Sequence, residues 1–260
     1  MLDTFFTRNS KIQMSSMPRI FATIEARMTS SRLPGKVLME AAGKPFLEHM
    51  VERLNRVSCL DGIVIATTNN STDDKVAELA AKLGVCCHRG SESDVLQRVL
   101  DAAIANRVDV IVETTGDCPL IDPSLVDDCI QEFIGSRVDY VSNILERTYP
   151  IGMDTQVFST GLLADVAGRT LDPVDREHVS LFIYRHPEIY SLKNVSAIPE
   201  LTRPQLRLTL DTPKDFELLR KIFETLYPKE PHFSLRDIIG FIDSDPALEK
   251  INADVQHNYV

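Results

Sequence analysis

The sequence predicts an α/β protein in which helices cover both faces of a mixed, mostly parallel β-sheet. Short apolar runs rich in β-branched residues alternate with stretches of helical periodicity over residues 19–143, and this alternation is typical of βα units. Residues 62–68 (GIVIATT) and 109–115 (DVIVETT) are nearly continuous apolar runs, as strands buried on both faces are. After residue 143 the alternation weakens, which predicts a smaller elaboration over residues 144–200 with an antiparallel part.

Each element of the first half is predicted by its own pattern. Strands are expected over residues 19–25, 62–68, 85–89, 109–115 and 139–143, and helices over 45–57, 72–84, 93–107 and from 122 onward, with a loop over 26–44. The helices are predicted by apolar stripes at helical spacing and by their boundaries. Thr72 is an N-cap candidate, Gly84 a helix stop, and Pro123 suits a first helical position.

The second half is expected to close the same domain. Residues 155–159 and 188–195 are expected to be extended, residues 175–187 helical, and residues 207–210 (RLTL) a strand that returns to the main sheet. Capping patterns at Thr212/Asp215 and Ser234/Asp237 predict two further helices. The resulting organisation is a flexible N-terminal extension over residues 1–18, a single domain over 19–246 and a polar C-terminal tail over 247–260.

Composition narrows the class of protein. The 260 residues are 43 % hydrophobic and 25 % charged, which is ordinary globular composition, and the net charge is −10. This charge argues against a protein that binds duplex nucleic acid by neutralising many phosphates. No apolar run reaches the roughly 18 residues of a membrane span. The five cysteines show no zinc-site spacing, so we expect reduced thiols and a cytoplasmic protein.

A cluster of cations follows the first predicted strand. Arg27, Arg32 and Lys36 lie within residues 26–36 (ARMTSSRLPGK), here called the basic loop. Open α/β sheets bind ligands at the carboxyl ends of their strands, and Arg and Lys donate to phosphate oxygens. The sequence has neither a dinucleotide fingerprint after the first strand nor a P-loop. The basic loop therefore predicts a polyphosphate site of another kind, unless it is only a solvated loop.

Two aspartates share the same position relative to their strands. Asp117 follows strand 109–115 and Asp211 follows the predicted strand 207–210. If both strands join the sheet, both carboxylates reach the edge where the basic loop lies, at exposed strand ends. Two carboxylates beside a polyphosphate are what Mg²⁺ takes, with water and phosphate oxygens completing its shell. Taken singly, each Asp is as readily a helix cap or turn residue.

The basic loop, ARMTSSRLPGK, resembles the nucleotide-binding signature of sugar cytidylyltransferases. The resemblance continues through GKPFLEHMVERL, IVIATT, RGSESDVLQR, ETTGDCPLIDP, DYVSN, YPIGMDTQVF, REHVSLFIY and LRLTLDTPKDFELL. It is greatest for the spore coat polysaccharide branch and extends to CMP-sialic acid and CMP-3-deoxy-octulosonate synthetases. It implies the Rossmann-like, GT-A-like fold of nucleotide-diphospho-sugar transferases, with a small lid or dimerisation region and a homodimer.

The resemblance also implies roles for individual residues. Arg27 and Lys36 would contact the triphosphate with help from Arg32, and Asp117 and Asp211 would hold Mg²⁺. By the same resemblance, the residues that would border the nucleotide are Ala26, Arg89, Ser91 and Asp94. Those that would border the sugar pocket are Asp154, Gln156, Glu177 and His178.

We therefore expect a Mg²⁺-dependent cytidylyltransferase that transfers CMP from CTP to a sugar acceptor, ulosonic-acid-like or related, and releases pyrophosphate. The family pattern Y-P-D-G-x-x-x-E stands here as YPIGMDTQ, without two of its acids, which leaves the acceptor open. Two alternatives also remain: an enzyme using another nucleoside triphosphate with a sugar 1-phosphate, and a non-catalytic nucleotide-binding subunit. The retained Asp117, Asp211, Arg27 and Lys36 speak against the second alternative.

Overall fold

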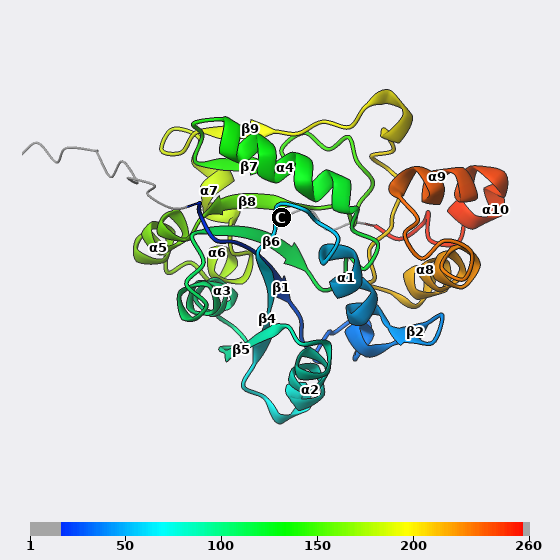
Figure 1. Ribbon diagram of the computed structural model, residues 1–260, viewed down its shortest axis with the longest axis horizontal. Helices are drawn as coiled ribbons and strands as arrows, with labels where there is room; N and C mark the ends of the chain where they lie inside the picture. Colours follow the sequence, from blue (N-terminus) through cyan, green and yellow to red (C-terminus); the bar gives the residue numbers. More distant parts are fainter. Residues whose placement is uncertain (1–16, 257–260) are drawn as a thin grey trace, which may run out of the picture.

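The predicted α/β architecture is confirmed by the computed structural model, which describes residues 17–256. A seven-stranded sheet in the order β5-β4-β1-β6-β8-β7-β9 forms its centre (Figure 1). The strands are β1 (Ile20–Glu25), β4 (Gly62–Thr68), β5 (Cys86–Gly90), β6 (Val110–Thr115), β7 (Tyr140–Ser142), β8 (Gln156–Ser159) and β9 (Leu192–Asn194). The predicted N-terminal extension falls almost entirely outside the described residues.

The sheet is parallel in one half and mixed in the other. β1 pairs in parallel with both β4 and β6, and β5 pairs in parallel with β4. β8 runs antiparallel to its neighbours β6 and β7, and β9 then pairs in parallel with β7. The βα alternation thus predicts the parallel half, and the weaker pattern after residue 143 corresponds to the strand that reverses direction.

Helices cover both faces of the sheet and bury two apolar clusters. The helices are α1 (Phe46–Leu54), α2 (Asp74–Leu83), α3 (Val95–Ala105), α4 (Pro123–Gly135), α5 (Thr160–Arg169), α6 (Pro173–Glu177), α7 (Leu181–Arg185), α8 (Pro213–Leu226), α9 (Leu235–Ser244) and α10 (Pro246–Glu249). Alternate residues of β1 divide between the faces: Ala22 and Ile24 pack with α1, α2 and α4, whereas Phe21 packs with α3, α5 and α7. Within residues 17–256, no helix has both the length and the apolar character needed to cross a membrane.

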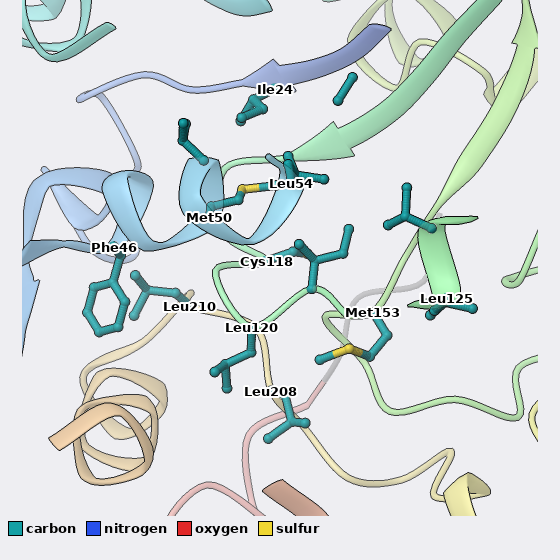
Figure 2. Packing of buried hydrophobic residues seen from close by; sticks show 14 of the residues in the cluster. Ile24, Phe46, Met50, Leu54, Cys118, Leu120, Leu125, Met153, Leu208 and Leu210 are labelled. Carbon is teal, nitrogen blue, oxygen red and sulfur yellow. The ribbon is translucent and has the colours of Figure 1, made fainter. Parts of the chain in front are cut away.

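The segment 207–210 is not the sheet strand that the sequence predicts. Its backbone is extended, but its only bridge outside the named strands is the isolated pairing of Arg207 with Ile151. Leu208 and Leu210 are fully buried, and Figure 2 shows both in the core near Leu120. The alternating leucines are therefore buried against loops below α1 rather than against a neighbouring strand.

The elaboration after residue 143 also differs in detail. The predicted helical segment 175–187 is split into α6 and α7, because Val179 between them takes a φ of +43°. Helix α5, capped by Ser159, was not anticipated. Within the predicted loop 26–44, strands β2 (Glu40–Ala41) and β3 (Lys44–Pro45) form a small hairpin.

Part of the predicted polar C-terminal tail is packed against the domain. Leu248 in α10 and Asn252 beyond it are buried. The Asn252 side-chain amide donates to the Arg207 carbonyl at 3.1 Å and to Asp215 Oδ1 at 2.8 Å. This segment therefore supports the chain just before and after Asp211.

Gly152 is required where the chain approaches the 207–210 segment. Its φ is +99°, and a Cβ there would lie 2.6 Å from the Leu208 carbonyl carbon. We expect Gly152→Ala to lower the free energy of unfolding by about 2–5 kcal/mol, from backbone strain plus displacement of the neighbouring chain. The matched control is Gly43→Ala: this glycine also has a positive φ, but its Cβ would meet nothing within 4 Å. That variant should lose only about 1–2 kcal/mol. Equal losses in urea unfolding would show that the close approach to Leu208 costs nothing.

Candidate functional site

A cavity of about 420 Å³ opens at the carboxyl ends of β1 and β6, where α3 and the α6–α7 connection face the sheet. Most of the site residues expected from the sequence line it, and they come from segments far apart in the chain. These residues are Ala26, Arg27, Arg32, Lys36, Asp117, Gln156, Glu177, His178 and Asp211.

The basic loop is folded by local contacts that direct Lys36 into the cavity. The Gly35 backbone takes a φ of +72° and begins a short 3-10 helix over Lys36–Leu38. Its N–H donates to the Met28 carbonyl at 2.9 Å, which closes the loop. The Met28 N–H donates to Asp73 Oδ1 at 2.7 Å, which ties the loop to the α2 side of the sheet.

Lys36 bridges the two predicted metal ligands. Its Nζ donates to Asp117 Oδ2 and to Asp211 Oδ1, each at 2.8 Å. Burial alone would lower the pKa of Lys36, but the two carboxylates outweigh it and raise that pKa. Burial likewise opposes ionisation of Asp117, yet Lys36 and a hydrogen bond from Thr115 bring the pKa of Asp117 down to about 2. The carboxylate pair, Asp117 and Asp211, is therefore close enough to share one cation.

Asp211 is not at an exposed strand end, as the sequence suggested, but is 5 % exposed. Its Oδ2 accepts from the Arg207 guanidinium at 2.8 Å, and Arg32 lies 3.0 Å from its Oδ1. Its backbone N–H donates to Asp215, the capping-box residue of α8. Because Arg207 also donates to Asp215 at 2.8 Å, a buried ion-pair network fixes the position of Asp211.

Arg27 is held by a carboxylate that sequence reasoning missed. Its Nη1 lies 3.3 Å from Glu92 Oε1, and Asn70 donates to the other oxygen of Glu92 at 2.8 Å. The Thr29 hydroxyl also donates to Glu92 and, as the main cause, lowers its pKa. Glu92 lies inside the RGSESD block, which the sequence places near the nucleotide. Its contact with Arg27 could not be predicted from the sequence.

Four other predicted site residues do not line the cavity. Arg89 donates to the carbonyls of Thr68 and Asn70 and pairs with Asp74. Ser91 Oγ accepts from the Asp94 N–H, and Asp94 caps α3 and pairs with Arg176. Asp154 forms a bidentate pair with Arg147, at 2.7 and 2.9 Å. These residues hold the loops around the cavity in place.

The far part of the cavity is built on β8 and on the break between α6 and α7. Gln156 Oε1 accepts from the hydroxyls of Tyr140 and Ser180, both at 2.6 Å, which fixes the amide at the cavity wall. Glu177 and His178 lie where α6 ends. Burial lowers the pKa of His178, so this imidazole is neutral at pH 7.

Two acids in the cavity lining, one buried and one half-buried, have no counterpart among the predicted site residues. Glu25 on β1 and Glu113 on β6 both line the cavity near Arg98 of α3. Burial raises the pKa of Glu25 well above its usual value, and burial raises that of Glu113 to about 8. The signal in the sequence was a glutamate inside each apolar run, IFATIE and VIVETT, since buried acids without a structural partner are rare.

A family model described as cytidylyltransferase matches residues 21–236 of this chain. The chain belongs to the cytidylyltransferase family. The resemblance predicted from the sequence blocks is thereby confirmed, and the protein is a nucleotidyltransferase. The non-catalytic alternative falls away on the same finding.

Relatives of this cytidylyltransferase span nearly its whole length. The spore coat polysaccharide biosynthesis protein SpsF of Bacillus subtilis is 34 % identical over 235 residues, covering 88 % of this chain and 96 % of its own. A 3-deoxy-manno-octulosonate cytidylyltransferase of Solibacter usitatus is 29 % identical, covering 80 % and 96 %. The solved structure of a cytidylyltransferase from Leptospira borgpetersenii superposes with a TM-score of 0.85 at 32 % identity, covering 94 % and 100 %.

The ion pair behind Asp211 makes a testable contribution to stability. Asp215 and Arg207 are both almost fully buried, so Asp215→Asn leaves a buried guanidinium partly uncompensated. Breaking such a pair typically costs about 3–5 kcal/mol. The control is Asp254→Asn, which removes an exposed partner of Lys214 on the same helix and should change stability by about 1 kcal/mol or less. Chemical denaturation of both variants decides the matter, and similar small losses would contradict the role given to Asp215.

Proposed function

We propose that this cytidylyltransferase transfers CMP from CTP to a hydroxyl group of a sugar acceptor, with Mg²⁺ as cofactor and pyrophosphate as the second product. One observation carries the proposal: two carboxylates, Asp117 and Asp211, converge on a single cation position inside a cavity edged by the basic loop. Its relatives act in spore coat polysaccharide biosynthesis and on an octulosonate, which supports a sugar acceptor.

The donor set at this position fits Mg²⁺. Each carboxylate has an oxygen 2.8 Å from the Lys36 ammonium, so one small cation could contact both. The described residues contain no group of three or more metal-binding side chains, which leaves the remaining positions to water and phosphate oxygens. Mg²⁺ is commonly held by one or two carboxylates together with substrate phosphates. When bound, the ion would neutralise charge on the α-phosphate during transfer.

The protein's own contribution is positioning and charge stabilisation. Lys36 is held beside the carboxylate pair, with a side chain 12 % exposed. With a metal ion on the pair, the ammonium of Lys36 would turn toward the phosphates and stabilise negative charge there. Arg27 and Arg32 lie on the more exposed edge of the cavity, with side chains 38 % and 47 % exposed. We assign these arginines to the β- and γ-phosphates, which leave as pyrophosphate. The sugar hydroxyl would then attack the α-phosphorus from the side of Gln156 and His178.

Calorimetric titration with the four nucleoside triphosphates, with and without Mg²⁺, tests the donor. We expect CTP to bind most tightly and only weakly without the metal, because the carboxylate pair repels phosphate unless a divalent cation intervenes. Tighter binding of GTP or ATP would favour the enzyme class that uses another nucleotide with a sugar 1-phosphate.

Substitution of the carboxylate pair tests the metal site. We expect Asp117→Asn and Asp211→Asn each to lower Mg²⁺-dependent pyrophosphate release about 10²–10³-fold, as removal of a group that stabilises transition-state charge does. Because Asp211 is buried, circular dichroism and unfolding of that variant must accompany the rates. Near-normal turnover in a folded variant would remove that residue from the metal site.

Lys36 should matter more for the rate than for ground-state affinity. Charge on the leaving pyrophosphate grows in the transition state, so an ammonium near it gains interaction energy as the reaction proceeds. We expect Lys36→Ala to reduce kcat by more than it weakens CTP binding and to leave CMP binding unchanged, since CMP lacks the leaving phosphates. Paired dissociation constants for CTP and CMP, measured with turnover, are the readout. Equal losses for both nucleotides would place Lys36 on the α-phosphate instead.

A further inference from the structure

The strands that border the cavity change from apolar to polar along a single face of the sheet. On β1 the residues facing α3 run Phe21, Thr23 and Glu25, and on β6 they run Ile111, Glu113 and Thr115. Phe21 and Ile111 belong to the apolar cluster under α3, whereas the two glutamates line the cavity. The cavity therefore begins where this apolar cluster ends, and Glu25 and Glu113 form its floor.

The two glutamates are neighbours on adjacent strands. In the parallel register Thr23 pairs with Glu113 and Glu25 pairs with Thr115, so the glutamates lie diagonally across two strands on one face. Burial and then the charge of Glu113 raise the pKa of Glu25, so the two side chains are close enough to interact. We call this pair the carboxyl floor.

Beyond a hydrogen bond between Ser180 and Glu113, one buried oxygen of each glutamate in the carboxyl floor has no hydrogen-bond partner among the described residues. Within residues 17–256, Glu25 Oε1 and Glu113 Oε2 are buried and accept no hydrogen bond, and the Nε of nearby Arg98 donates none. Arg98 directs its Nη1 to the backbone carbonyls of Ser91 and Glu92 instead. The guanidinium of Arg98 therefore acts on Glu25 through its charge but not through a hydrogen bond, and a buried acceptor without a donor costs about 1–3 kcal/mol. A protein retains such groups where a ligand supplies the missing donor.

The position of Glu113 separates it from the phosphate end of the site. Glu25 directly precedes the basic loop, where Lys36 and the arginines favour an anion, whereas Glu113 lies on the neighbouring strand β6. In the strand register, Glu113 of β6 lies opposite Gln156 of β8. The side-chain oxygen Oε1 of Gln156 already accepts hydrogen bonds from Tyr140 and Ser180. An unpartnered acceptor oxygen beside an amide is the arrangement that binds a hydroxyl group or an amino group. The same burial that raises the pKa of both glutamates also disfavours the negative charge of a ligand carboxylate there.

We propose that Glu25 and Glu113 form the floor of the sugar subsite and select an acceptor that presents hydrogen-bond donors there, amino or hydroxyl groups rather than a carboxylate. This rests on the proposed cytidylyl transfer and narrows its acceptor class. It is consistent with Ile151 and Gln156 standing where the family pattern has acids, because the acidic side chains of this cavity are then Glu25 and Glu113.

The experiment compares acceptors of the three chemistries with the intact enzyme, CTP and Mg²⁺. Pyrophosphate release is measured with amino sugars such as glucosamine, with neutral sugars and their 1-phosphates, and with 3-deoxy-octulosonate as the sugar acid. We expect turnover with an amino or a neutral sugar, and the better of the two identifies the donor that the floor binds. Faster turnover of the sugar acid than of both others would overturn the proposal.

Variants then locate the effect in the subsite. Glu113→Gln and Glu25→Gln keep the shape of the side chain but replace one acceptor oxygen by an NH₂ donor. We expect the acceptor KM to rise about 10- to 100-fold, as leaving a buried polar group unpaired implies, while the CTP dissociation constant stays unchanged. Glu217→Gln, on the exposed side of α8, is the matched control and should change neither constant.

The outcomes separate the acceptor inference from the proposed function. If the variants weaken CTP binding and leave the acceptor KM unchanged, the carboxyl floor binds the nucleoside, and the inference fails while cytidylyl transfer stands. If the wild-type enzyme does not bind CTP with Mg²⁺, the proposed function itself fails, and the acceptor assignment fails with it.

Discussion

The arrangement of the site depends on one buried ammonium group held between two carboxylates. Lys36 lies 81 residues from Asp117 and 175 residues from Asp211 in the chain, so this contact joins the basic loop, the end of β6 and the start of α8. Without the ammonium, two acids would face each other in a partly dry cavity, where like charges repel strongly. The same position gives the protein a place for a divalent cation, because whatever neutralises the pair must be small and positive.

The parallel half of the fold is predictable from the sequence, because the residue patterns of its strands and helices are local. The strands GIVIATT and DVIVETT are nearly continuous apolar runs, and the helices between them carry clear apolar stripes. The prediction of a sheet strand at RLTL is wrong, because alternating leucines fit equally well a strand and an extended segment packed on loops. The prediction of one helix across α6 and α7 is also wrong, because Val179 takes a positive φ and interrupts the helix. Valine has no preference for that conformation, so the residue type does not indicate the break.

The candidate site divides in the same way. The places of Arg27, Arg32, Lys36 and Asp117 at the cavity were predictable from a motif and a strand end. Asp211 also lines the cavity, but the segment before it is not the predicted sheet strand. Arg89, Ser91 and Asp94 lie in one recognisable block, but their side chains bind neighbouring loops of the protein. Residue type alone does not distinguish such a structural contact from a contact with a ligand. Glu92 and the carboxyl floor were missed, because their significance depends on partners that only the folded chain brings near or fails to provide.

The contact of Asn252 with the Arg207–Asp215 pair bears on how the protein is made. Asn252 follows Arg207 by 45 residues, and chains emerge from the ribosome with the N-terminal part first. The segment that supports Asp211 is therefore among the last to be synthesised. Helices α8 and α9 also pack in the same apolar cluster as β1, so the cation site and one side of the core are both completed only by the last part of the chain.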